Sequence, residues 1–485
     1  MINVFKNLTL QQKLQAVLLA LMPAIIVVFL FVRDVPVPLF TSIFLGILTL
    51  WIASFYYEGT YQIEDIPFLL LVVGTFAFGR AFSIISIISI RNIPVPVTET
   101  VLALSLALMV FKWREVLNTW KNLVPKDFKI LLPLYLVVGT VYLLLGLKAN
   151  GAIAVRDIVF CHYMLFLFIT LHVFSKPGKI KRVLIVFIPG VVILLLIRFI
   201  INFITRTGKV SFINFLFESR EFNWALYCGL AAIFALSFFT FKNKKILKWG
   251  LGLVIYFGLL FMLLTEIRAG WLGMIPALLL LTFMLKKEIK IILLILPLIV
   301  LSLIFIDTYI HGNTLEVIKQ EIAGLTPGDR DTRSEKNVAF RLQIWKQTID
   351  KIKEKPVFGW GFGSFPRYYI DKRPLHKPSG SIGPGSHVTP AHNHILAFTY
   401  KMGLLGIAVF IFINLRIFLM GVLYLGKCES VFHRRFLAAA LTGLVYWHGM
   451  AFFFDVLESP PTGIFLWVIL GLILSIVQVD RQNSP

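Results

Sequence analysis

The sequence predicts an all-α polytopic membrane protein with about 12–14 transmembrane helices and one long extracytoplasmic loop that contains short helices. The chain has 485 residues, of which 58% are hydrophobic and only 15% are charged. Ordinary soluble domains carry about 25% charged residues. Runs of eighteen or more mostly apolar residues recur along the chain. Each of these runs is long enough to cross a hydrocarbon core of about 30 Å.

The apolar runs can be placed one by one along the chain. The first follows Lys6 and Lys13 and has no small-residue cleavage pattern after it. We therefore expect a retained helix and not a removed signal peptide. The expected spans lie near residues 14–32, 38–56, 66–88, 95–112, 129–147, 156–174, 183–203, 222–241, 247–265, 269–285, 290–307, 395–425, 435–455 and 461–479.

Three parts are expected from this layout. Residues 1–307 form an N-terminal transmembrane bundle, residues 308–394 form the large loop, and residues 395–485 supply the C-terminal transmembrane helices. The loop is too short and too rich in Gly, Pro and charged residues to bury the core of a catalytic domain of its own. The stretch 395–425 exceeds one span, and its Gly403–Gly406 break predicts a short re-entrant piece followed by a helix.

The formal net charge of +22 follows the topology, so nucleic acid is not an expected partner. Lys and Arg gather in alternate short loops, as the cytoplasmic loops of membrane proteins do. This alternation places both termini in the cytoplasm and residues 308–394 on the opposite side. The three cysteines are isolated and imply neither a disulfide framework nor a metal site. The basic clusters run from Lys112 to Lys129, Lys176 to Arg182, Lys242 to Lys248, Lys286 to Lys290 and Lys427 to Arg435.

One convincing helix is expected inside the loop, over residues 338–353. Its apolar residues recur at a spacing of four and three and make one stripe, so the helix would lie on the membrane surface or cap the bundle. Pro356 ends it, and Gly359–Gly363 make a flexible aromatic turn that is not a dinucleotide fingerprint. The stripe consists of Val338, Leu342, Trp345, Ile349 and Ile352.

The strongest candidates for chemistry are Arg268, Arg341 and His392, which the predicted topology places at one membrane face. The planar fork of Arg suits phosphate recognition, because it offers paired charge-assisted hydrogen bonds. A neutral His can accept a proton from an attacking hydroxyl near pH 7. Together the three side chains fit transfer from a diphosphate-linked donor. Arg268 could also be an interfacial residue whose charge simply reaches the lipid headgroups.

Other charged and metal-ligating residues give weaker signals. Arg80 lies well inside an expected span, where it would pair with a carboxylate or contact a lipid phosphate. Arg156 and Asp157 flank another span and could pair with each other. Metal binding by the histidines of the loop is disfavoured, because no Cys and no suitably spaced Glu accompanies them. These histidines are His387, His392 and His394.

The motifs at these positions resemble the O-antigen ligase family, within a wider superfamily of bacterial envelope ligases and polymerases. The family pattern of His, then Asn, Ser or Gln, then nine residues and Gly-x-x-Gly, is met without a gap. The Arg268-Ala269-Gly270 turn resembles the family's Arg-containing turn before its large periplasmic loop. The matching stretches are Arg341 to Trp345, Pro356 to Gly363, His392-Asn393 and Gly403 to Gly406.

The resemblance implies transfer of an O-antigen glycan from undecaprenyl diphosphate to lipid A-core, at the periplasmic face of the bacterial inner membrane. It implies neither a metal nor another cofactor. By position, His392 would be the general base, and Arg268 and Arg341 would contact the diphosphate. Asn393 would orient the His or the sugar, or else cap the following helix. Direct displacement of the diphosphate would invert the anomeric centre.

Two alternatives stay open at this point. One is a related transferase with the same donor, either an O-antigen polymerase or an oligosaccharyltransferase that acts on protein hydroxyls. The other is a transporter of lipid-linked glycans, for which an intramembrane Arg80 would be reasonable. A transporter should carry its polar residues near mid-membrane. The candidates here gather at one face, which favours the transferase.

Overall fold

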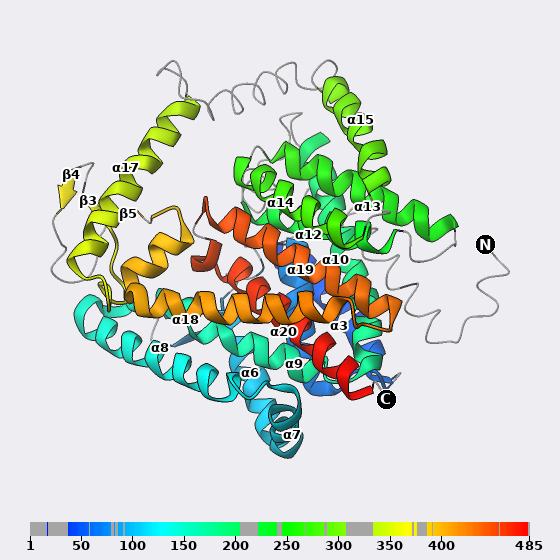
Figure 1. Cartoon of the computed structure of the whole chain (residues 1–485), viewed down its shortest axis with the longest axis horizontal. Coiled ribbons are helices and arrows are strands. Elements are labelled where there is room, and N and C mark those ends of the chain that lie inside the picture. The colour runs from blue at the N-terminus through cyan, green and yellow to red at the C-terminus, as the bar shows by residue number, and fades with distance from the viewer. Residues whose placement is uncertain are drawn as a thin grey trace. The chain divides into compact units, whose positions relative to one another are not determined.

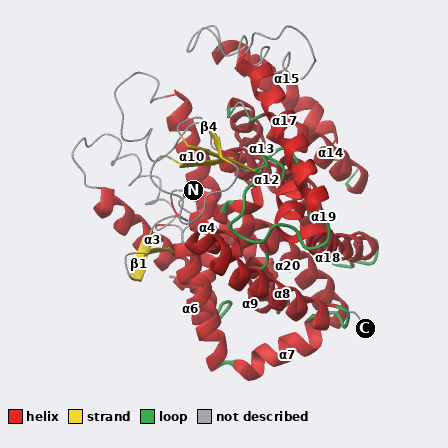
Figure 2. Cartoon of the chain, turned by 90° about the vertical axis from the view of Figure 1, so that its left-hand side faces the viewer, coloured by secondary structure: helices red, strands yellow, loops and turns green. Residues whose placement is uncertain are grey.

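The computed structural model shows a multi-pass, all-α membrane protein, as the sequence predicts. Helices, red in Figure 2, make up nearly all of the regular structure, and the strands are short. The structure describes residues 17, 37–57, 59–78, 82, 86–90, 93–203, 222–239, 245–265, 267–285, 289–306, 333–370, 373–375, 386–389, 391–454 and 456–483.

Within these residues five helices are long and apolar enough to cross a membrane, and a bent pair over residues 153–173 would make a sixth. Four shorter apolar helices accompany them. The expected total of about 12–14 spans stays a prediction, because it includes residues outside the described part, such as most of the expected span 14–32. The division at residues 307 and 394 stays a prediction too.

One expected span is too long. The expected helix over residues 66–88 ends at Phe78, and residues 86–90 form a strand that pairs with residues 93–96. The stretch is rich in β-branched Ile, and Pro94 and Pro96 follow it, which disfavours a continuing helix.

The chain divides into two compact units, and the first comprises residues 1–123, 168–219 and 478–485. Most of its helices agree with the expected spans to within a few residues. Its described elements are α3 (Val37–Tyr57), η1 (Ile63–Asp65), α4 (Ile66–Phe78), β1 (Ser86–Ile90), β2 (Ile93–Pro96), α6 (Val97–Phe111), α7 (Trp113–Leu123), most of α9 (Leu165–Val173) and α10 (Pro177–Phe203).

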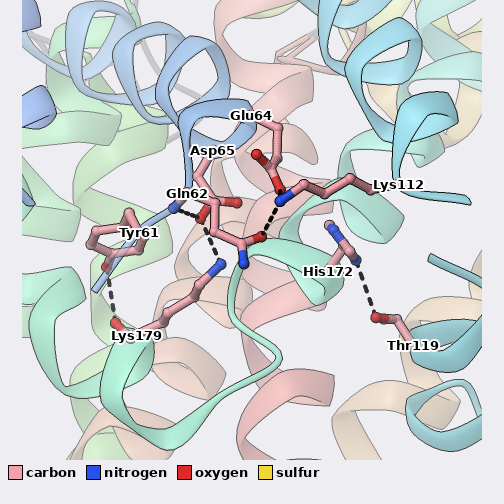
Figure 3. Close-up of polar contacts among 8 residues, drawn as sticks. All are labelled: Tyr61, Gln62, Glu64, Asp65, Lys112, Thr119, His172 and Lys179. Carbon is pink, nitrogen blue, oxygen red and sulfur yellow. Dashed lines mark hydrogen bonds and ion pairs between the residues drawn. The ribbon is translucent and has the colours of Figure 1, made fainter. Parts of the chain in front are cut away.

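A polar cluster ties three stretches of the first unit together (Figure 3). Lys112 contacts Glu64 at 2.8 Å, and the buried Lys179 contacts the buried Asp65 at 2.6 Å. The Tyr61 hydroxyl donates to the Lys179 carbonyl at 2.9 Å. Burial works to raise the pKa of Glu64, but the hydrogen bond and charge of Lys112 outweigh it and leave this pKa below its usual value. At Asp65 burial prevails over Lys179 and raises the pKa.

The second unit comprises residues 124–167 and 220–477 and holds every described candidate residue. Its helices pack closely where glycines meet: a Cβ on Gly449 would lie 2.6 Å from the Cα of Gly273. Its described elements are α8 (Phe128–Asn150), η2 (Gly151–Phe160), η3 (His162–Met164), α12 (Phe222–Phe238), α13 (Lys245–Leu264), α14 (Arg268–Met284), α15 (Ile289–Ile306), α17 (Arg333–Glu354), β3 (Arg367–Ile370), β4 (Arg373–Leu375), β5 (Ser386–Thr389), α18 (His394–Leu425), α19 (Val431–Ala451), η7 (Val456–Glu458) and most of α20 (Pro460–Asn483). In its small antiparallel sheet, β3 lies between β4 and β5.

Helix α18 is broken at Gly403, where φ is +69°. The rings of Phe398 and Phe410 lie 4.9 Å apart, and those of His394 and Phe410 lie 6.2 Å apart. Phe398 and Phe410 are twelve residues apart, which in a straight helix would be about 18 Å, and His394 is farther still from Phe410. Residues 394–402 therefore fold back along the start of the long helix, and both arms are visible in Figure 1. We call residues 394–402 the folded-back segment; it corresponds to the short piece before the break that the sequence predicts.

Helix α17 confirms the helix expected at residues 338–353, but it buries a different face. Ile344 and Thr348 are fully buried, whereas Leu342 is 57% exposed and Ile349 is 41% exposed. The predicted stripe put Leu342 and Ile349 on the same face as Trp345, toward either the membrane surface or the bundle. Instead, these two lie on the outer face of the helix.

Candidate functional site

Segments that carry or adjoin the candidate residues pack around one end of α19 in the second unit. We call residues Tyr446–Phe454 the α19 end. Three segments that are far apart in sequence contact it: the start of α14, the middle of α17 and the start of the folded-back segment. The first two segments carry Arg268 and Arg341, and the third begins two residues after His392.

Arg268 is the first residue of α14 and is half-buried. Small residues let this helix approach the α19 end very closely. A Cβ on Gly270 would lie 3.5 Å from the Tyr446 hydroxyl oxygen, and one on Gly273 would lie 3.0 Å from the Met450 nitrogen. The first two turns of α14 are therefore held beside the last two turns of α19. Arg268 therefore stands at the N-terminal end of a helix, where the partial positive charge of the helix also favours an anion.

Arg341 reaches the α19 end from α17. Its Nη1 donates to the Phe453 carbonyl at 3.3 Å, and its guanidinium carbon lies 4.8 Å from the centre of the Phe454 ring. One turn further along, the rings of Trp345 and Phe452 meet edge to face at 5.9 Å. A side chain held by both a carbonyl and a ring face has a defined orientation, as phosphate recognition requires.

His392 has a backbone conformation that few residues adopt. Its φ is +51°, and no other non-glycine residue in the described part of the chain has a positive φ. Such strain often marks a functional position. The imidazole is half-buried, and its ring centre lies 6.5 Å from that of Phe340, the neighbour of Arg341 on α17. The base candidate and one arginine candidate are thus linked through adjacent residues of one helix.

Asn393 caps α18. Its side-chain oxygen accepts a hydrogen bond from the Leu396 nitrogen at 3.0 Å, and the residue is buried. The capping role that the sequence left open is therefore present. The cap fixes the start of the folded-back segment directly after His392.

Sequence reasoning considered His394 only as a metal ligand and missed its polar neighbours His448 and Asn414, which lie directly behind this start. The buried His394 ring lies 5.6 Å from the His448 ring and 5.7 Å from the Trp447 ring. His448 in turn contacts the Asn414 side-chain oxygen at 3.3 Å through its Nε2. These contacts join residues from both arms of α18 to α19. Only the fold-back brings them together, so spacing along the sequence gave no signal for them.

The remaining candidates lie elsewhere. Arg80 is outside the described residues. His387 is on β5, where it pairs with Tyr369 of β3. Asp157 forms an ion pair with Lys401 at 2.5 Å, a partner that the sequence did not suggest. Within the described part of the chain, no three His, Cys, Asp or Glu side chains are grouped so that they could hold a metal ion.

Comparison with known proteins confirms the resemblance to the O-antigen ligase family. Residues 251–411 match the family model described as O-antigen ligase, and this region contains the start of α14, α17 and the folded-back segment. Proteins named "Putative polysaccharide ligase" from Rickettsia felis and Rickettsia bellii are 25% and 28% identical over 240 and 248 residues. These matches cover 49% of this chain and 54% of each relative, so the chain spans about half the length of the curated relatives it matches.

Proposed function

We propose, from the O-antigen ligase match over residues 251–411, that this membrane protein transfers a glycan from undecaprenyl diphosphate to lipid A-core at the periplasmic face of the bacterial inner membrane. Three observations support the proposal: Arg341 contacts the α19 end, α14 packs against that end and begins at Arg268, and His392 lies beside Phe340, the neighbour of Arg341 on α17. One base and two cations are the groups that displacement of a diphosphate needs.

In the proposed reaction, His392 takes the proton from the acceptor hydroxyl while that oxygen attacks the anomeric carbon. The bond between the anomeric carbon and the diphosphate oxygen breaks from the opposite face, and the electron pair leaves with the diphosphate. Arg268 and Arg341 stabilise the charge of this leaving group. A diphosphate leaves well without protonation, so no acid is required. Since the displacement is direct, it inverts the anomeric configuration.

Three acceptors distinguish this function from its nearest alternatives. The purified protein, in nanodiscs with an undecaprenyl-diphosphate-linked glycan, is offered lipid A-core, a second lipid-linked glycan or a protein with exposed hydroxyls. We expect transfer to lipid A-core. Extension of the second lipid-linked glycan would identify a polymerase, and a glycosylated protein would identify an oligosaccharyltransferase. If only the lipid-linked donor crossed the bilayer and no glycosidic bond formed, a transporter would replace the transferase.

The orientation that the proposal needs can be measured separately. An accessibility tag inserted near Gly380 is expected to react from the periplasm, whereas tags near Gly178 and Lys244 are expected to react only from the cytoplasm. The reason is that Lys and Arg gather in the loops around the last two positions. Labelling of intact and permeabilised cells with an impermeant reagent gives the answer. Cytoplasmic labelling at position 380 would place the α19 end on the wrong side for this reaction.

A further inference from the structure

A buried ion pair lies outside the proposed reaction centre. Lys401 Nζ is 2.5 Å from Asp157 Oδ1, and their side chains are 2% and 0% exposed. The other carboxylate oxygen accepts a hydrogen bond from the Gly363 nitrogen at 2.6 Å. The ammonium also lies 5.1 Å from the centre of the Phe160 ring and 4.8 Å from that of Phe365. Both charges are therefore fully engaged, as burial requires.

This pair anchors a turn that follows α17. We call residues Pro356–Phe365 the glycine turn. It docks on the break of α18 through backbone hydrogen bonds: the Trp360 nitrogen donates to the Tyr400 carbonyl at 2.8 Å, and the Gly361 nitrogen donates to the Lys401 carbonyl at 2.9 Å. In the opposite direction, the Leu404 nitrogen of α18 donates a hydrogen bond to the Pro356 carbonyl of the turn at 2.7 Å.

Helix α8 holds the glycine turn from the side opposite α18. The Tyr142 hydroxyl donates to the Phe358 carbonyl at 2.7 Å, and the Asn150 amide donates to the Phe362 carbonyl at 2.7 Å. Both donors belong to α8. The glycine turn is thus fixed from two sides, by α8 with Asp157 and by the broken α18.

The turn lies between the two elements that carry the proposed chemistry. It begins two residues after α17, which holds Arg341, and it is bonded to the end of the folded-back segment, whose start follows His392. The angle between α17 and the folded-back segment therefore depends on how the turn is seated. Errors of about 1 Å in such an arrangement can cost about a hundredfold in rate.

We propose that Asp157 and Lys401 are positioning residues of the glycan transfer reaction, which act by seating the glycine turn so that Arg341 and His392 keep their relative place. The inference rests on the proposed function. A pair of charges suits this task because an ion pair with fixed hydrogen-bond partners accepts only one arrangement, whereas apolar packing accepts several. Buried ion pairs add little net stability, so a role in specifying geometry accounts better for this one.

The first test uses two glycines of the turn that both have a positive φ. Gly359 and Gly361 have φ values of +67° and +85°. A Cβ at Gly359 would lie 2.6 Å from the Gly403 nitrogen and 2.7 Å from the Lys401 carbonyl, whereas one at Gly361 meets nothing within 4 Å. Gly359→Ala therefore adds a clash with the break of α18 to the backbone strain, whereas Gly361→Ala adds strain alone. We expect kcat to fall about tenfold or more in Gly359→Ala with donor binding retained, and to fall clearly less in Gly361→Ala.

The second test removes both charges at once, because a single change would leave a buried charge without its partner. Asp157→Asn with Lys401→Met keeps an acceptor for the Gly363 nitrogen and keeps the apolar stem of the lysine. The matched control is Asp65→Asn with Lys179→Met in the first unit. In that pair, the Asp65 carboxylate also contacts a buried lysine, Lys179, at 2.6 Å. It also accepts a hydrogen bond from a backbone nitrogen, that of Gln62, at 2.8 Å. We expect a loss of kcat in the first double variant only, measured per folded molecule.

A readout without substrate separates this inference from the proposed function. Spin labels on Asp350→Cys of α17 and Leu415→Cys of α18 occupy exposed sites, and the three native cysteines are buried. We expect the distance distribution between the labels to broaden in Gly359→Ala and in the Asp157/Lys401 double variant, and to stay narrow in the controls. A narrow distribution in all variants would overturn the seating role. A broadened distribution with unchanged kcat would show that the seating does not serve the reaction, and absence of transfer by the native protein would contradict only the proposed function.

Discussion

Replacement of His392 by alanine is expected to lower the rate of glycan transfer by about 10²–10⁴-fold, the usual cost of removing a general base. Binding of the lipid-linked donor should persist, because the arginines and not His392 hold the diphosphate. The turnover assay therefore runs beside a donor-binding assay, with equal membrane levels of each variant. A His392→Ala protein that turns over normally would remove the base from the mechanism. Retention of the donor's anomeric configuration in one step would exclude direct displacement.

The positive φ of His392 calls for a second variant. Asn adopts the left-handed conformation more readily than most residues, so His392→Asn removes the imidazole and keeps the backbone. We expect it to be as inactive as His392→Ala. Should His392→Asn be active while His392→Ala is not, the backbone conformation and not proton transfer would explain the loss.

Neighbouring histidines serve different purposes as controls. His387, on β5, is expected to tolerate alanine with little loss of transfer. His394 is 3% exposed and packs against Trp447 and His448, so its alanine variant leaves a cavity and should lower the amount of folded protein. Its activity must therefore be expressed per folded molecule. On that basis we expect it to lose much less than His392→Ala.

Hydropathy predicted the helices well because crossing a bilayer constrains both length and composition. The expected spans 129–147 and 247–265 correspond to α8 and α13. Which face of a helix is buried was less predictable. The apolar stripe of α17 was expected to face either the membrane surface or the bundle, and the pattern could not tell that Ile344 and Thr348 would be buried while Leu342 and Ile349 stay exposed.

Pairings between distant residues could not be predicted. Asp157 and Lys401 are separated by 244 positions, and the sequence offered Arg156 as a nearer partner for Asp157. The approach of His394 to His448 depends on the break at Gly403, where the sequence predicted a re-entrant piece but not which residues of α19 it would meet. The candidate residues themselves were found because they break the apolar pattern. A charged side chain in or beside a membrane span costs free energy, so it often marks a functional site.

Changing either arginine to lysine is expected to abolish most of the transfer activity while the protein still inserts. Arg268→Lys and Arg341→Lys keep the charge but lose the planar fork that binds two phosphate oxygens at once. Loss of one donor that stabilises a developing anion costs about 10²–10³-fold in other enzymes. The native Arg341 contacts both the Phe453 carbonyl and the face of the Phe454 ring. A lysine at this position lacks the planar fork that makes both contacts at once. We therefore expect losses of about a hundredfold or more for each variant, measured as transfer from the lipid-linked donor.

Arg416 supplies the matched control within the same unit. It forms an ion pair with Asp127 at 3.1 Å, and the two side chains are 42% and 38% exposed. Such surface pairs contribute about 0–1 kcal/mol, and a lysine can replace the charge, so Arg416→Lys should transfer glycan at nearly the native rate. Near-native transfer by both Arg268→Lys and Arg341→Lys would rule out two-pronged recognition of the diphosphate. A positive charge anchored at the membrane surface would then be enough, because lysine supplies that charge as well as arginine does.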